Sequence, residues 1–313
     1  MSEQACRIQP MQAADIEQVI QLDKNLGKDS RPDFFHRRLE MMQSAGDRYL
    51  CFTSVYDASL CGFLFARILT GEFGAQRPVA VLDAIGVQPG NWGQGVGMQL
   101  MERVKQEAAM RGCGEIRTQV DWHQQELLAY FANAGFTLGS RHVLKRDTSA
   151  LVLPDREDEL DDPESDQYEL RPVRTLAESD IDAILRIDRH ITKEDRSVYL
   201  REKVDEVVSH SGMRVSMVAE QEGMVTGFIM ARLDYGSFGR ASSTAVIDTL
   251  GVGPEYKSSG VGSALMAQLL DNLASVRVED VRTEVEWDSF ELNRFLSDCA
   301  FKPSQHLALS CVI

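Results

Sequence analysis

Apolar residues recur along this chain at two spacings, and each spacing predicts one kind of element. Ile16, Val19 and Ile20 share one face of a helix, so they predict an opening helix over about Ala14–Asp23. The same spacing returns in the second half and predicts a helix over about Ser179–Asp188. We expect each helix to bury this apolar face against a neighbouring layer.

Alternating apolar and polar positions follow each opening helix. Arg48–Val55 and Gly62–Ile68 predict a hairpin that turns at residues 57–59. Arg214–Glu220 and Gly227–Leu233 predict the same hairpin in the second half. The remaining elements expected in the first half are a strand over Val81–Val87, a long helix from about Gly97 with Gly112 as its C-cap, a strand over Glu115–Asp121, a short helix over about Glu126–Ala134 and a last strand.

The two halves of the chain repeat each other. A shift of 165 positions aligns them without gaps from Gly62 to Phe136, and residues 81–101 match residues 246–266 at ten of 21 positions. Arg117 and Thr118 meet Arg282 and Thr283 in this alignment. The chain is therefore an internal duplication of one mixed α/β unit.

The charge distribution marks a boundary between the copies. Residues 155–167 hold eight acids and one arginine, a local charge of −7, and almost no apolar residues. We interpret residues 150–167 as an acidic linker between a first domain (1–149) and a second domain (168–313). The first domain has 16 basic and 17 acidic residues, a charge of −1, and the second has 16 and 23, a charge of −7.

Composition excludes several classes of protein. With 33 Lys and Arg against 48 Asp and Glu, the chain carries −15 at pH 7, which disfavours binding to nucleic acid or to an anionic membrane. Its apolar runs are too short to span a bilayer, and its first ten residues lack the apolar segment of a signal peptide. Six scattered cysteines, without a CxxC pair, predict neither a disulfide framework nor a metal site. We therefore expect a cytoplasmic protein.

The chemistry is expected at the loop between the fourth strand and the long helix, GVQPGNWGQGVG (86–97) and GVGPEYKSSGVG (251–262). A helix N-terminus offers unpaired N–H groups, and glycines let a phosphate approach them. A Walker loop is excluded because neither copy has Lys-Ser or Lys-Thr after its last glycine. The dinucleotide pattern GxGxxG fits poorly, because Met98 stands at the last glycine and Ser258 at the first.

Both loops resemble the pyrophosphate loop of the GNAT acyltransferase superfamily, [QR]-x-x-G-x-[GA] after a strand that ends in Val-x-Pro. Val87-Gln88-Pro89 leads to Gly95-Val96-Gly97, and Val252-Gly253-Pro254 leads to Gly260-Val261-Gly262. The order of elements and the segment Ala134-Gly135-Phe136 are also similar to that family. The resemblance implies two tandem GNAT-like domains, each a mixed, mostly antiparallel sheet flanked by helices.

The resemblance further implies an N-acetyltransferase that uses acetyl-CoA and an amine acceptor, a small molecule or a peptide. The main chain near Val87 or Val252 would pair with the pantetheine arm. The pyrophosphate would be held by the loop residues, which are Trp92, Gly93, Gln94, Gly95, Val96 and Gly97 in the first copy and Lys257, Ser258, Ser259, Gly260, Val261 and Gly262 in the second.

Three features depart from the family pattern, and the first is Ala300, which replaces the family's glycine in the segment Cys299-Ala300-Phe301 of the second copy. The opening Gln or Arg of the motif is Trp92 in the first copy and Lys257 in the second. The family's usual leaving-group acid, a tyrosine, is Phe131 in the first copy and Leu296 in the second. Which copy binds the donor stays open. The glycines of the first loop and the near-neutral charge of the first domain favour the first copy slightly.

Three residues are candidates for the acid and base that acyl transfer needs. Asp83 and Asp248 lie in apolar strands, where alternation puts Asp83 on the face of Val81, Ile85 and Val87, and desolvation there would raise the pKa of such a carboxyl. The alternative is a structural aspartate paired with Arg67 or Arg232. Tyr130 is a candidate acid, with a packed helix tyrosine as the alternative.

The acceptor is not specified by any motif. Trp122 and Trp287 follow the fifth strand of each copy beside acidic residues, which would suit a cationic amine, although a packing role is equally consistent. Glu72, whose counterpart is Ser237, marks either asymmetry between the copies or an exposed turn. We also expect the two domains to pair into an intrachain pseudo-dimer, with further oligomerisation open. The chain also resembles mycothiol synthases, a subfamily of similar length and tandem arrangement, although no acceptor-specific motif supports that subfamily.

The alternatives to a two-site enzyme are a non-catalytic acyl-CoA sensor or assembly module, and one catalytic half with a structural partner half. The missing tyrosine in both copies favours the sensor.

Overall fold

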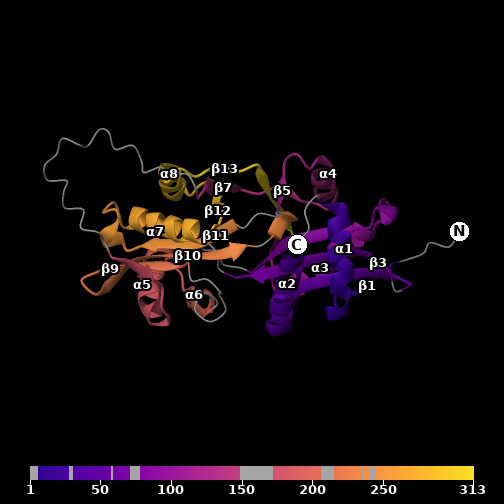
Figure 1. The fold of residues 1–313 in the computed structure, drawn as a ribbon, viewed down its shortest axis with the longest axis horizontal. Coiled ribbons are helices and arrows are strands. Elements are labelled where there is room, and N and C mark those ends of the chain that lie inside the picture. Colours follow the sequence, from indigo (N-terminus) through magenta and orange to yellow (C-terminus); the bar gives the residue numbers. More distant parts are fainter. Residues whose placement is uncertain are drawn as a thin grey trace.

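Two mixed seven-stranded sheets, each with helices on both faces, make up the described part of the chain (Figure 1). This computed structural model describes residues 6–27, 31–57, 59–70, 78–148, 172–205, 215–234, 236–239 and 244–313. The predicted acidic linker and Glu72 lie outside these residues. The mixed α/β class expected from the sequence is confirmed.

The duplication is visible in the elements, which follow the same order in both halves. The first half contains β1 (Arg7–Pro10), α1 (Ile16–Leu26), α2 (Pro32–Ser44), β2 (Tyr49–Tyr56), β3 (Ser59–Leu69), β4 (Val79–Val87), α3 (Val96–Met110), β5 (Glu115–Asp121), α4 (Gln125–Asn133), β6 (Thr137–Leu138) and β7 (Arg141–Asp147). The second half contains β8 (Val173–Thr175), α5 (Ile181–Thr192), α6 (Ser197–Asp205), β9 (Met217–Gln221), β10 (Met224–Asp234), β11 (Thr244–Val252), α7 (Val261–Ser275), β12 (Asp280–Glu286), α8 (Phe290–Asp298), β13 (Lys302–Pro303) and β14 (His306–Val312).

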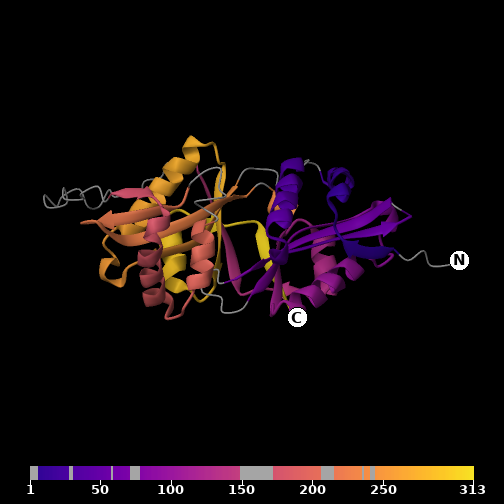
Figure 2. The same ribbon diagram turned by 90° about the horizontal axis from the view of Figure 1, so that it is seen from below.

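The sheets exchange their last strands. The first sheet has the order β1-β2-β3-β4-β5-β14-β6, and the second has β13-β7-β12-β11-β10-β9-β8. Strand β14, from the end of the chain, therefore pairs with β5 of the first half, and β7 pairs with β12 of the second half. Figure 2 shows the yellow C-terminal strand among the strands of the first half. Division of the sequence at residues 149 and 168 thus does not divide the sheets.

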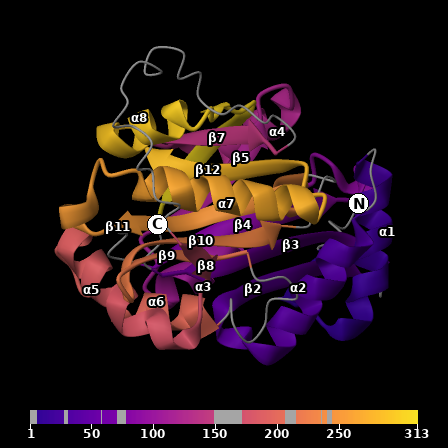
Figure 3. The same cartoon turned by 60° about the vertical axis from the view of Figure 1, so that its left-hand side comes forward.

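Each sheet lies between two hydrophobic clusters. On one face of the first sheet, α3 and α4 pack through Leu100, Val104 and Phe131, and on the other α1 and α2 pack through Val19 and Phe35. In the second sheet, α7 takes the place of α3, and α5 and α6 cover the opposite face. Figure 3 shows α7 on one side of the second sheet and α5 and α6 on the other.

The predicted helices and central strands are present with ends shifted by a few residues, and Gly112 follows α3 with φ +79°, as a helix C-cap glycine does. The sequence reasoning missed α2 and α6. It also missed the edge strands β1 and β8, of four and three residues, which are too short to show a periodicity. In the described part of the chain, no helix is long and apolar enough to cross a bilayer.

Candidate functional site

Strands β4 and β5 pair for only a short distance and then separate. Their parallel pairing joins Ala80 to Ile116 and Val81 to Arg117, although β4 continues to Val87. In the second sheet, β11 and β12 pair at residues 244–246 with 280–282, and β11 continues to Val252. Among the described residues, one edge of the last part of β4 and of β11 is therefore left without a neighbouring strand.

A threonine closes the ladder at the point of separation in each sheet. The Thr118 hydroxyl donates to the Leu82 carbonyl at 3.0 Å, and the Thr283 hydroxyl donates to the Ile247 carbonyl at 3.2 Å. Each hydroxyl thus joins the two strands one residue beyond their last paired positions. Thr118 and Thr283, which the repeat aligns, therefore make the same contact in the two sheets.

Beyond this point, β4 and β11 turn main-chain groups toward the separated strand. Gln88 N–H donates to the Cys61 carbonyl at 2.8 Å, so in the alternating antiparallel ladder Val87 directs its own N–H and C=O away from β3. Gly253 N–H donates to the Thr226 carbonyl at 2.8 Å, so the N–H and C=O of Val252 likewise point away from β10. Such an edge can pair with an extended ligand as an added strand would.

A β-bulge changes the expected orientation of the candidate aspartates. Phe65 pairs with Ala84 and Ala66 with Leu82, which leaves Asp83 as the extra residue of β4. Ile85 and Val87 consequently pack on the α3 side with Leu82, whereas Asp83 faces α2. The prediction that Asp83 shares a face with Ile85 and Val87 was wrong, because the bulge shifts the alternation by one residue. Asp248 is the extra residue of a matching bulge in β11.

Both aspartates are buried in ion pairs. Asp83 is 2% exposed and lies 3.1 Å from Arg67 Nε and 2.7 Å from Arg38 Nη2. Asp248 is 3% exposed and lies 3.1 Å from Arg232 Nε and 3.2 Å from Lys203 Nζ. This geometry favours the structural alternative for both residues, with Arg38 and Lys203 as partners that the sequence did not indicate.

The pKa of Asp248 moves opposite to the expected direction. Burial favours the neutral acid, but the charges of Arg232 and Lys203 outweigh it and hold the pKa of Asp248 below its ordinary value. The predicted rise was therefore wrong for this residue. A carboxylate held ionised in this way is a weak proton acceptor.

The aspartate network crosses between the halves of the chain. Arg38 also donates to the Ser237 hydroxyl at 3.1 Å, and Ser237 belongs to a short 3-10 helix, η8 (Ser237–Gly239), of the second half. The η8 segment packs against β4 and β5. The region around Asp83 therefore includes residues from both halves, which the repeat alone could not indicate.

The two glycine loops have the same backbone shape. Gly95 and Gly260 each occupy the N-cap of the long helix, with φ +79° and +84°. Two positions earlier, Gly93 and Ser258 also have positive φ, +74° and +60°. The first N–H groups of the helix that follows have no carbonyl partner within it, so each loop offers donors for an anion.

The loops differ at the first position of the motif. In the first copy, the Trp92 indole N–H donates to the Val87 carbonyl at 2.8 Å, so Trp92 occupies one of the main-chain groups at the free edge. In the second copy, Lys257 takes this place and its ammonium lies 3.0 Å from Glu291, with both side chains exposed. The second loop thus adds a cation beside its N–H groups. These contacts argue against the slight preference for the first copy.

Tyr130 lies against the first loop, and its hydroxyl is already hydrogen-bonded to the main chain. Its hydroxyl donates to the Gly97 carbonyl at 2.8 Å, and burial raises the pKa of Tyr130. Phe131, at the position of the family's usual acid, is 2% exposed in the core, and Leu296 is equally buried. The geometry favours the packed-tyrosine alternative for Tyr130.

Trp122 and Trp287 are exposed at the ends of β5 and β12, with 53% and 44% of their surface accessible. Next to Trp122, the imidazole of His123 lies 2.8 Å from Asp121. Although burial acts in the other sense, hydrogen bonds from the backbone and ring of His123 hold the pKa of Asp121 below its ordinary value. Among the described residues, no cluster of three or more His, Cys, Asp or Glu could hold a metal ion.

Comparisons with known proteins agree with this arrangement. The model of the acetyltransferase (GNAT) family matches residues 16–136 and, separately, residues 181–301. A comparison with curated proteins gives no match.

Three solved structures share the fold over almost the whole chain. The glucosamine N-acetyltransferase region of a fungal multi-domain β-N-acetylglucosaminidase has a TM-score of 0.67 at 14% identity, with 97% of this chain and 38% of that chain covered. A tandem GNAT protein from the clavulanic acid biosynthesis pathway has 0.65 at 15%, covering 98% of both chains. A GCN5-related N-acetyltransferase from Sphaerobacter thermophilus has 0.61 at 14%, covering 99% and 95%.

This chain therefore spans 38% of the length of the fungal protein and nearly all of the other two. At these identities the likeness shows the fold alone. The family match, by contrast, covers more than half of the chain and falls on both copies of the repeat. The chain belongs to the acetyltransferase (GNAT) family and contains two tandem copies of its domain.

Proposed function

We propose that this protein is an N-acetyltransferase that transfers the acetyl group of acetyl-CoA to an amine, and that the second domain holds the donor. The carrying observation is the free edge of β11 next to a loop with a positive-φ N-cap glycine, Gly260. This combination offers main-chain pairing for the two amides of pantetheine and N–H groups for the pyrophosphate.

The residues of the second domain divide the binding between them. The N–H and C=O of Val252 would pair with the pantetheine arm. The N–H groups of Ser258 and of Gly260 to Gly262 would hold the pyrophosphate, and Lys257 would add a charge-assisted contact. In the first domain, Trp92 would have to leave the Val87 carbonyl before the same pairing formed.

The transfer itself requires two proton movements. The amine nitrogen attacks the thioester carbon, the carbon–sulfur bond breaks, the amine loses a proton and the thiolate gains one. Asp83 and Asp248 are held as buried ion pairs, and Phe131 and Leu296 carry no acidic group. We therefore assign the proton transfers to water at the open edge. The main contribution of the protein would be to position the two substrates.

Calorimetric titration of acetyl-CoA tests the donor site. We expect binding to be lost in Gly260→Leu and retained in Gly95→Leu, because a side chain at the N-cap would occupy the space above the helix N-terminus. Gly90→Leu, in the turn before the first loop, is the control for the same substitution, since a Cβ at Gly90 meets no atom within 4 Å. Thermal melting of each variant verifies folding. If neither Gly260→Leu nor Gly95→Leu weakened binding, the loop assignment would be wrong.

A non-catalytic acyl-CoA sensor is the second candidate function. The buried Phe131 and Leu296 at the usual position of the acid favour it. Release of free CoA from acetyl-CoA in the presence of a panel of amines distinguishes the two. Turnover that depends on the amine supports the enzyme, and tight binding without turnover supports the sensor.

A further inference from the structure

Two cysteines that are far apart in the sequence meet in the first domain. Sγ of Cys6 lies 3.0 Å from Sγ of Cys61, and 55 positions of the sequence separate the two residues. All six cysteines of the chain are free, and in the described part of the chain this pair alone has thiols that are hydrogen-bonded to each other. Neither cysteine belongs to a CxxC motif, so only the fold brings the two sulfurs together.

The contact spans one strand of the first sheet. Cys6 directly precedes β1, the edge strand, in which Arg7 pairs with Val55 of β2. Val55 pairs in turn with Leu60 of β3, the residue before Cys61. Both cysteines pack against the hydrophobic cluster beside α3, so their side chains lie on the same face of the sheet.

The second domain shows that this part of the fold does not need a thiol. The Cys61 carbonyl accepts a hydrogen bond from Gln88 N–H, and the Thr226 carbonyl accepts the matching bond from Gly253 N–H. Thr226 therefore stands at the position of Cys61, and its hydroxyl donates to the Ala219 carbonyl at 3.3 Å. Since a residue without sulfur fills the equivalent place, packing alone does not account for Cys61.

The two thiols differ in their access to solvent. Cys6 is partly exposed, whereas Cys61 is 4% exposed. Burial, and then the neighbouring Cys6 thiol, raise the pKa of Cys61 to about 12, so this residue is a neutral thiol near pH 7. An oxidant in solution therefore reaches Cys6 first, and Cys61 is in position to react with the oxidised sulfur.

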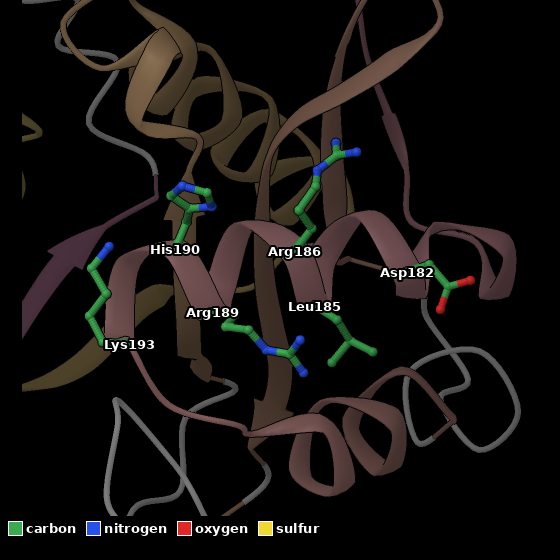
Figure 4. A pocket seen from close by; sticks show the side chains of 6 residues that line it. All are labelled: Asp182, Leu185, Arg186, Arg189, His190 and Lys193. Carbon is green, nitrogen blue, oxygen red and sulfur yellow. The ribbon is translucent and has the colours of Figure 1, made fainter.

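The buried position of Cys61 contrasts with an open hollow on α5 of the second domain. Ile184 and Ile187 of α5 pack in the core, and the charged side chains that line the hollow are exposed, so the hollow faces solvent. Its lining residues are Asp182, Leu185, Arg186, Arg189, His190 and Lys193 (Figure 4). In the first domain, by comparison, the cysteine pair joins a buried group to a partly exposed one.

We propose that Cys6 and Cys61 form a reversible intramolecular disulfide and that the first domain thereby responds to hydrogen peroxide. The Cys6 thiolate attacks the peroxide, the O–O bond breaks, and a sulfenic acid forms with loss of water. The Cys61 sulfur then attacks the sulfenic sulfur, the S–O bond breaks, and a second water leaves. The two thiols lose two electrons in total, and one peroxide is reduced to two molecules of water. The sulfurs need to approach by only about 1 Å to reach the S–S distance of about 2.05 Å.

The bond fixes the start of the edge strand. Strand β1 has four residues and pairs with β2 alone, so its hydrogen bonds open more readily than those of the central strands. A bond from Cys6 to Cys61 ties the N-terminal end of β1 to β3. The site lies in the first domain, whereas the donor is assigned to the second, so this oxidation does not depend on the proposed function.

Thiol counting on the full chain tests the site. The reduced protein is treated with hydrogen peroxide, unfolded and titrated with dithionitrobenzoate. We expect six thiols before the treatment and four after it, a digest in which the peptides of Cys6 and Cys61 are joined, and six thiols again after dithiothreitol. In the oxidised protein, hydrogen exchange should slow in β1 and stay unchanged in β8, the matching edge strand of the second sheet.

Two variants each remove one partner of the pair. Cys6→Ser and Cys61→Thr, the second of which copies Thr226, should keep five thiols under the same treatment. The control Cys299→Ser removes the other partly exposed cysteine and should still lose two thiols to the bond between Cys6 and Cys61. Thermal melting verifies that each variant is folded.

Six remaining thiols in the treated wild type, or a bond between two chains in place of the internal one, would overturn the proposal. An equal loss of thiols in the wild type and in Cys6→Ser would do the same, because the reaction would then involve other cysteines. An internal bond that left the hydrogen exchange of β1 unchanged would show that the first domain does not respond to the oxidation.

Discussion

The guanidinium of Arg38 lies 2.7 Å from the carboxylate of Asp83, and both side chains are buried. Arg38 comes from α2 and Asp83 from the bulge of β4, so their contact fixes a helix to the strand that forms the free edge of the first domain. Because Arg38 also reaches Ser237, the same contact links the two halves of the chain.

Removal of Arg38 should destabilise the protein strongly. We expect Arg38→Met to lower the free energy of unfolding by about 3 kcal/mol, because Asp83 would lose one of two cations in a buried site. Urea unfolding measures this. Arg103→Met, which breaks an exposed pair with Glu107, should cost less than about 1 kcal/mol. Asp83→Asn distinguishes a structural role of Asp83 from a catalytic one. A lower kcat with an unchanged free energy of unfolding would identify Asp83 as a catalytic base.

The ion pairs of Asp248 should appear in the pH dependence of stability. The folded-state pKa of Asp248 is lowered, so its contribution is complete above the unfolded-state value of about 4 and is lost as the pH falls through the lower folded-state pKa. We expect Asp248→Asn to be less stable than the wild type at pH 7, with a difference that shrinks below pH 4. Urea unfolding from pH 7 to pH 3 checks this. A constant difference over that range would contradict the assignment, since other aspartates titrate in both proteins.

The strand exchange predicts reciprocal effects of two equivalent leucines. Leu309 in β14 packs in the core beside α3, and Leu144 in β7 packs in the core beside α7. We expect Leu309→Ala to cost about 2–3 kcal/mol and to speed hydrogen exchange in β5, in the first sheet. Leu144→Ala should do the same in β12. Val312→Ala, 85% exposed, is the control. Faster hydrogen exchange in the half of the sequence that contains the substitution, and not in β5 or β12 of the other half, would contradict the strand exchange.

The positive φ at position 258 predicts opposite effects in the two loops. A serine in the left-handed region is strained by about 1 kcal/mol relative to glycine. We expect Ser258→Gly to raise the melting temperature and Gly93→Ser to lower it, since a Cβ at Gly93 meets no atom within 4 Å and adds only backbone strain. Differential scanning calorimetry of both variants is the measurement. Changes of the same sign would show that the two loops differ in shape.

Trp92 should compete with the donor at the first domain. In a Gly260→Leu background, which isolates the first site, Trp92→Phe removes the indole N–H that occupies the Val87 carbonyl. We expect acetyl-CoA to bind about fivefold more tightly, which corresponds to one neutral hydrogen bond. Trp122→Phe is the matched control at an exposed tryptophan. Weaker binding in Trp92→Phe would instead make the indole part of the donor site.

Much of the fold was predictable because the sequence contains two copies of the same α/β unit. The repeat from Gly62 to Phe136 and the apolar spacing identified the central strands and the main helices, and the loops around Gly95 and Gly260 were located with their context. Helices α2 and α6 were not predicted. Helix α2 has a mixed pattern in which even Arg38 is buried, so its polar and apolar positions do not mark its faces.

The sequence by itself determined the duplication, the mixed α/β class and the positions of the two loops, because periodicity, glycines and repeated segments are local properties. Only the tertiary structure decided that β7 and β14 change sheets, since strand pairing joins residues far apart and either sheet could accept either strand. The same holds for Asp83 and Asp248. Each aspartate is the extra residue of a bulge that is invisible in the sequence, and each forms buried ion pairs, Asp83 with Arg38 and Asp248 with Lys203.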